Sequence, residues 1–185
     1  MNGHLLTLLL FGVVIAANNL VVSLALGAMG RRDRFFRIIL SFAFFEFTIP
    51  LAGVWLGRKV SETLSLHASW LGPAILAGLG AFMMISAGRS GLDRAKLARA
   101  VTSWKGLIAL SAGLSVDNLV AGFGLGMRGV PPLAMAVTIM GFSVVFSFIG
   151  LRTGHLVKRD YEKAGTAATG GLLIALAGAS IAGWI

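Results

Sequence analysis

Cysteine is absent from this 185-residue sequence, and charged residues make up only 12% of it. Without thiols the chain forms no disulfide, thiolate metal site, iron–sulfur cluster or cysteine nucleophile. Soluble domains usually carry about a quarter charged residues, so a normal water-facing surface is excluded. The sequence also lacks a nucleophile–base constellation, a phosphate-binding loop and the alternating apolar period of an outer-membrane barrel. We therefore expect neither an enzyme nor a soluble domain.

Hydrophobic residues make up 57% of the sequence and gather in long runs. The six runs are Leu5–Ala28, Phe36–Gly57, Ser69–Gly88, Gly106–Met127, Val130–Gly154 and Ala164–Ile185. Each has about the 20 residues that a helix needs to cross a bilayer. The first run follows no basic stretch and ends in no cleavage site, so we expect a retained helix. The sequence predicts an all-α polytopic membrane protein with six transmembrane helices in a single transmembrane domain, residues 1–185.

The 16 Lys and Arg residues, which with seven acids give a formal net charge of +9, are distributed unevenly. Thirteen follow the first, third and fifth runs: Arg31, Arg32, Arg34, Arg37, Arg89, Arg94, Lys96, Arg99, Lys105, Arg152, Lys158, Arg159 and Lys163. The other side holds Arg58, Lys59 and Arg128. Short loops rich in Lys and Arg stay in the cytoplasm, so both termini should lie outside it. The excess positive charge therefore indicates the orientation of the chain in the lipid bilayer, with a weak attraction to anionic lipid, and we expect no nucleic-acid partner.

An internal repeat divides the chain into two parts. Residues 18–27 align with residues 117–126 at an offset of 99, and Gly53 and Gly57 align with Gly150 and Gly154 at an offset of 97. We place repeat one at about 4–88 and repeat two at about 104–185. A short cytoplasmic linker of about 89–103, either an interfacial helix or a solvated segment, joins them. Three helices per repeat require the second copy to be inverted, which is typical of secondary transporters.

Two of the seven acidic residues, Glu46 and Asp117, fall at the centres of apolar runs, and Asn18 lies at a similar depth. An ionised carboxylate at the bilayer centre costs roughly 3 kcal/mol on insertion scales. No Lys, Arg or His occurs at that depth in any run. The pattern therefore favours a bound cation or proton over a structural ion pair.

Residues around these acids supply further oxygen atoms. Pro50 cannot donate to the carbonyl of Glu46, so that oxygen becomes free in a broken helix, unless Pro50 only kinks the helix for packing. Asn118 and Asn19 add neutral oxygens. We expect structural or pathway roles for Pro50, Ser23, Ser115 and Gly122. Carboxylate, amide and hydroxyl oxygens suit Mg²⁺, Ca²⁺ or Mn²⁺. We expect a transported ion and no permanently bound cofactor, with proton exchange as a hypothesis.

Several segments resemble the bacterial manganese efflux pump family of the lysine-exporter superfamily. They are Phe11-Gly12 followed by the polar pair and Ser23, residues 46–53 with the sequence EFTIPLAG, and residues 115–122 with the sequence SVDNLVAG. The resemblance implies six helices, inverted repeats, outside termini and acidic metal-handling residues in helices one and four. Glu46 and Asp117 match, whereas Asn18 replaces the first acid, and Ser86 and Ala87 stand where the family often has a Glu.

The sequence as a whole predicts a secondary transporter of the bacterial cytoplasmic membrane that exports a divalent metal cation. Mn²⁺ is the favoured ion. We expect Asp117 and Glu46 to bind the metal, with Asn18, Asn118 and Asn19 adding neutral oxygens. Two alternatives remain: a small-solute or amino-acid exporter of the same superfamily, and a non-transporting membrane subunit. The sequence leaves a homo-oligomer open.

Overall fold

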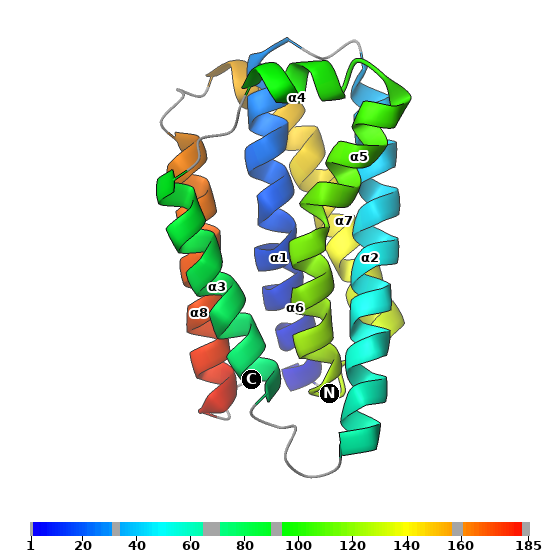
Figure 1. Ribbon diagram of the computed structural model, residues 1–185, viewed down its shortest axis with the longest axis vertical. Coiled ribbons are helices and arrows are strands. Elements are labelled where there is room, and N and C mark those ends of the chain that lie inside the picture. Colours follow the sequence, from blue (N-terminus) through cyan, green and yellow to red (C-terminus); the bar gives the residue numbers. More distant parts are fainter. Residues whose placement is uncertain (1, 31–33, 65–70, 90–93, 157–160, 183–185) are drawn as a thin grey trace.

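The computed structural model describes residues 2–30, 34–64, 71–89, 94–156 and 161–182, which are almost entirely helical (Figure 1). The helices are α1 (Asn2–Ala28), α2 (Phe35–Leu64), α3 (Leu71–Arg89), α4 (Arg94–Ala100), α5 (Trp104–Leu114), α6 (Val116–Gly126), α7 (Pro132–Thr153), the 3-10 helix η2 (Gly154–Leu156) and α8 (Tyr161–Ile181). The long helices run along the bundle, and α4 lies across one end. The predicted linker thus contains a short helix.

The helices are apolar enough for a bilayer. Four apolar segments are long enough to cross it: Leu8–Ala28, Phe35–Thr63, Trp104–Gly126 and Pro132–Leu156. The described apolar parts of α3 and α8, Leu71–Ile85 and Ala167–Ala179, are shorter. Outward-facing Phe36, Phe82 and Leu133 are 84%, 66% and 63% exposed. Since helices satisfy their own backbone hydrogen bonds, this is the architecture of a helical membrane protein, as predicted. The count of six spans stays a prediction.

Helices that the sequence repeat matches run in opposite directions along the bundle. In Figure 1, α1 rises from the lower end whereas α5 and α6 descend, α2 descends whereas α7 rises, and α3 rises whereas α8 descends. Helix α1 begins and α8 ends at the lower end, which we call the terminus end. We call the opposite end, where α4 lies, the basic end. Its described basic residues are Arg34, Arg37, Lys96, Arg99, Lys105 and Arg152. The side chains of the other seven predicted for this side lie outside the described part.

Glycines let α1 and α7 approach until their backbones touch. A Cβ atom added at Gly27 would lie 2.5 Å from the carbonyl oxygen of Gly150. A Cβ atom at Gly154 would lie 2.1 Å from the carbonyl oxygen of Leu24. Small residues at such spacings permit close helix packing in membranes, where apolar burial alone does not drive association.

Helices α2 and α6 meet in the same way. A Cβ atom at Gly57 would lie 2.0 Å from the carbonyl oxygen of Phe123, and one at Gly126 would lie 2.1 Å from that of Val54. The glycines that the sequence aligned at an offset of 97 therefore occupy two equivalent helix contacts. These contacts hold the polar centre of the bundle at fixed spacing.

The fourth apolar run is not one continuous helix. It divides at Ser115, whose φ of −92° and ψ of 0° separate α5 from α6. The break lies two residues before Asp117 and places that acid in the first turn of α6. Helix α2, by contrast, continues through Pro50. The expected broken helix therefore occurs in the second acidic span and not at the proline.

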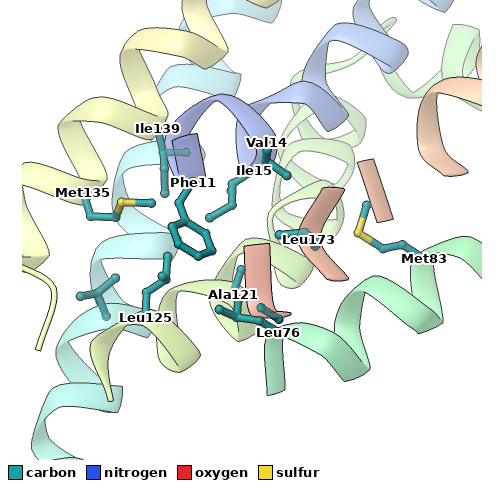
Figure 2. Packing of buried hydrophobic residues seen from close by; sticks show 12 residues of the cluster. Phe11, Val14, Ile15, Leu76, Met83, Ala121, Leu125, Met135, Ile139 and Leu173 are labelled. Atoms are coloured by element: carbon teal, nitrogen blue, oxygen red, sulfur yellow. The ribbon is translucent and has the colours of Figure 1, made fainter. Parts of the chain in front are cut away.

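Apolar side chains fill the bundle on both sides of its centre. Figure 2 shows the larger cluster, which includes Phe11, Val14, Ile15, Leu125, Met135 and Ile139. A second cluster toward the basic end comprises Val22, Ala25, Leu26, Ile38, Phe42, Leu97, Val101, Leu107 and Leu151. Leu97 and Val101 bring α4 into this packing.

Candidate metal-binding site

Ten polar side chains are buried within the described part of the chain. They are Asn19, Ser23, Ser41, Glu46, Ser111, Ser115, Asn118, Ser143, Ser147 and Thr169. A buried polar group is costly unless it has a hydrogen-bond partner, and a buried charge is costlier still. The partners of these groups therefore show how the site is built.

Glu46 lies on α2, is 1% exposed and accepts hydrogen bonds from the α5–α6 segment. Asn118 Nδ2 donates to Oε1 at 2.8 Å and to Oε2 at 2.7 Å. Ser115 Oγ, at the helix break, donates to Oε1 at 3.0 Å. Both carboxyl oxygens of Glu46 therefore act as acceptors.

Asp117 is held from a different helix. Asn18 Nδ2, on α1, donates to Asp117 Oδ2 at 2.9 Å. The backbone N–H of Asn118 donates to Asp117 Oδ1 at 2.9 Å. The first turn of a helix carries unpaired N–H groups and a partial positive charge, which favour an acid at this position. The break at Ser115 thus gives Asp117 a helix N-terminus in the middle of the bundle.

The two carboxylates belong to one polar layer. Asn118 contacts both acids, because its side chain donates to Glu46 and its backbone N–H donates to Asp117. Asn19 lies beside Glu46 as well, and its Nδ2 donates to Ser143 Oγ on α7 at 2.5 Å. The layer therefore joins α1, α2, α6 and α7. No basic side chain in the described part of the chain acts on either carboxylate.

The structure brings together the five predicted ligand candidates, Asp117, Glu46, Asn18, Asn118 and Asn19, and the predicted pathway residue Ser115 donates to one of them. The pathway residue Ser23 is buried on α1 one turn beyond Asn19. Gly122 has a packing role, because a Cβ atom there would lie 2.8 Å from the carbonyl oxygen of Pro50. The side chain of Ser86 lies outside the described residues.

Sequence reasoning missed Ser143 and Ser147 on α7. The offset of 97 that aligns the glycines also aligns Glu46 with Ser143 and Pro50 with Ser147. Applied to Glu46, that offset identifies Ser143 as a second polar position of the same layer. A serine in an apolar helix is a weak indication of a binding site, because its hydroxyl usually bonds to the helix backbone.

The layer supplies an oxygen-rich set of possible ligands. Within the described residues, no three His, Cys, Asp or Glu side chains gather at one place. The oxygen atoms that could bind a metal belong to two carboxylates, the side-chain carbonyls of the neighbouring asparagines and the Ser115 hydroxyl. Hard divalent ions such as Mn²⁺ and Mg²⁺ bind oxygen ligands of this kind and keep water molecules at the remaining coordination positions. Two carboxylates also match the charge of one divalent ion.

Comparisons with known proteins point the same way. The family described as "Putative manganese efflux pump" matches residues 29–181. A protein of Halalkalibacterium halodurans named "Putative manganese efflux pump MntP" is 32% identical over 158 residues, 84% of each chain. The protein of that name from Bacillus velezensis is 30% identical over 174 residues, 93% of this chain and 91% of its own. No solved structure matches the chain.

Proposed function

The chain belongs to the manganese efflux pump family, and from that premise we propose that it exports a divalent metal cation across the cytoplasmic membrane. Mn²⁺ is the favoured substrate of this proposal. One observation carries the proposal. Glu46, which is buried, and Asp117, which is partly buried, lie in one polar layer where amides, a hydroxyl and a backbone N–H hold them, and no described basic side chain neutralises them. A divalent cation would supply the missing charge.

Asp117 and Glu46 are the metal ligands of this proposal, and the asparagines have two roles. An asparagine that donates through Nδ2 keeps its Oδ1 as an acceptor or metal ligand. Asn18 and Asn118 use Nδ2 to hold the carboxylates, so each retains one oxygen for the ion. Asn19 is the weaker candidate for a neutral ligand, because its Nδ2 donates to Ser143.

Six transmembrane helices in two inverted repeats complete the proposal. It is supported by the opposite directions of matched helices and by the equivalent glycine contacts of α1 with α7 and α2 with α6. With the basic end in the cytoplasm, both termini lie outside. Export would then proceed by rocking of the repeats about the central polar layer.

Proton exchange is the coupling that this site chemistry favours. Burial in apolar surroundings disfavours an ionised carboxylate when no metal is bound. Release of the metal to the outside would therefore favour proton uptake by Glu46 and Asp117. The metal-free site would then carry these protons back to the cytoplasmic side.

Flux of Mn²⁺ into inside-out membrane vesicles tests the function. We expect the native protein to transport Mn²⁺ and the variants Asp117→Ala and Glu46→Ala to lose transport. Gly141→Ala is the control, because a Cβ atom at Gly141 meets nothing within 4 Å. Native-like transport by both acid variants would show that the assigned site is wrong. Lack of divalent-cation flux in the native protein would refute the proposed function.

A further inference from the structure

Two buried hydroxyls beside the candidate site have no hydrogen-bond partner in the described part of the chain. They are Ser23 Oγ on α1 and Ser147 Oγ on α7, and both residues are 0% exposed. A hydroxyl in a helix commonly bonds to the carbonyl four residues earlier. Six described residues make that bond: Thr48, Thr63, Thr102, Ser111, Thr138 and Thr153. Ser23 and Ser147 do not, although an unpaired buried hydroxyl is unfavourable.

The two hydroxyls lie in one layer of the α1–α7 interface. Ser23 follows Asn19 by four residues on α1, and Ser147 follows Ser143 by four residues on α7. Asn19 and Ser143 are hydrogen-bonded, and α1 and α7 run in the same direction, so one helical turn brings Ser23 and Ser147 to the same level. A Cβ atom at Gly150 would lie 2.6 Å from Ser23 Cβ, so the interface is tight here.

This layer extends the polar site toward the basic end. Helices α1 and α7 both end there, so Ser23 and Ser147 lie between the acids and the basic end. On the opposite side the described core is apolar and includes Phe11, Leu125 and Met135 (Figure 2). One turn beyond the serines, Leu26 and Leu151 belong to the second apolar cluster, so the pair lies between the acids and that cluster.

A second serine pair on the same side has a different character. Ser41 Oγ and Ser111 Oγ lie 2.7 Å apart, and Ser111 also donates to the carbonyl of Leu107 at 2.9 Å. These hydroxyls bind each other and the backbone. Of the two described serine pairs, only the one on α1 and α7 has hydroxyls without a hydrogen-bond partner.

We propose that Ser23 and Ser147 form a second, uncharged oxygen site, opened when the two repeats rock apart, that holds the partly hydrated divalent cation between the basic end and the carboxylates. This inference rests on the proposed function. Hydroxyl oxygens replace some water ligands of a hard ion, and without a carboxylate they hold it weakly enough to pass it on. Asn19 and Ser143 lie between this site and Glu46 and complete the path.

Removal of the hydroxyls tests the role. We expect Ser23→Ala/Ser147→Ala to lower the initial rate of Mn²⁺ uptake into inside-out vesicles about tenfold, which corresponds to about 1.4 kcal/mol. Mn²⁺ affinity of the purified variant should stay within about twofold of native, because Asp117 and Glu46 remain. The matched control is Thr138→Val, which removes an α7 hydroxyl on the terminus-end side. A native uptake rate in the double variant would overturn the inference.

The absence of cysteine provides a second test that does not depend on removing polar groups. Ser23→Cys and Ser147→Cys each introduce the only thiol of the chain, at nearly the size of serine. We expect a membrane-impermeant cationic methanethiosulfonate, added at the basic end, to modify these thiols, and Mn²⁺ to slow the reaction. Val14→Cys, in the apolar cluster, should stay unmodified from that side.

The outcomes separate this inference from the proposed function. If the native protein transports Mn²⁺ while both serine thiols stay unmodified, the second site is wrong and the exporter stands. If the thiols react but Mn²⁺ gives no protection, the layer is a water path and the cation site is wrong. If the native protein carries no divalent cation, the proposed function fails first.

Discussion

The amide of Asn18 donates a 2.9 Å hydrogen bond to the carboxylate of Asp117, and these two residues occupy matching positions in the two similar segments of the chain. A residue and its counterpart 99 positions later thus contact each other across the centre of the bundle. One is an amide and the other an acid. The two residues hold equivalent positions in their segments, but only Asp117 can carry a charge.

The next pair of contacts repeats this arrangement. Asn118 donates to Glu46, and its counterpart Asn19 donates to Ser143, which the offset of 97 aligns with Glu46. Each acid therefore has a neutral residue at the matching position of the other segment. The hydrogen-bonding framework has two similar halves, and each half contributes one carboxylate at a different place.

Restoration of the missing acid at position 18 should strengthen metal binding. Asn18→Asp places a second carboxylate beside Asp117, and neighbouring carboxylates repel each other until a cation joins them. We expect Mn²⁺ to bind about tenfold more tightly, or about 1.4 kcal/mol. The metal-free variant should melt at a lower temperature than native. Titration of the purified protein with Mn²⁺ measures the affinity.

Asn18→Ala is the control for this substitution, because it removes the amide donor and adds no charge. Its Mn²⁺ affinity should fall below native. Equal affinities in Asn18→Asp and Asn18→Ala would contradict the role of charge at this position.

The sequence predicted that the two acids and Asn18 lie at one depth, and there is a simple physical reason why it could. Apolar runs are long and have a clear midpoint, so Glu46, Asp117 and Asn18 could be assigned to one depth from their positions alone. The structure joins Asn18 to Asp117 by a hydrogen bond and links Asp117 to Glu46 through Asn118. Depth follows from counting residues, since each adds 1.5 Å along a helix.

Partners and breaks were less predictable. Hydropathy does not reveal that Ser115 donates to Glu46 or that the helix divides there, because serine is ordinary in an apolar run. Pro50 was the more obvious signal, yet α2 continues through it, and its carbonyl lies against Gly122. Neighbouring helices can absorb the effect of a membrane proline, which a single segment cannot show.

The two matching asparagines should differ in their importance for stability. Asn118→Ala removes a donor from a buried carboxylate, whereas Asn19→Ala removes one from a hydroxyl. Hydrogen bonds to charged groups contribute about 1.5–3 kcal/mol and neutral ones about 0.5–1.5 kcal/mol. We therefore expect a larger loss of thermal stability in Asn118→Ala at alkaline pH, where Glu46 is ionised without metal. Melting in detergent, with each variant serving as control for the other, measures the difference. A greater loss in Asn19→Ala would contradict the assignment.

The glycine contact between α2 and α6 should tolerate no side chain. A Cβ atom at Gly126 would lie 2.1 Å from the carbonyl oxygen of Val54, so Gly126→Ala must push the two helices apart. Because this contact holds Glu46 against Asn118, we expect loss of both folding yield and Mn²⁺ affinity. Gly113→Ala is the control, since nothing lies within 4 Å of its Cβ position and alanine favours a helix by about 1 kcal/mol. Equal behaviour of the two variants would contradict the packing.

Mn²⁺ binding should release protons, and the number released should depend on Asp117. A metal ligand must be deprotonated, so acid competes with the metal and the affinity falls as pH falls. In Asp117→Asn one of the two carboxylates is replaced by an amide of the same shape, which leaves one fewer group that can release a proton. We expect fewer protons released per Mn²⁺ and a shallower dependence of affinity on pH. Calorimetry in buffers of different ionisation enthalpy counts the protons. Gly113→Ala should release the native number. Equal proton release by native protein and Asp117→Asn would mean that Asp117 binds metal without exchanging protons, and that Glu46 alone carries the coupling.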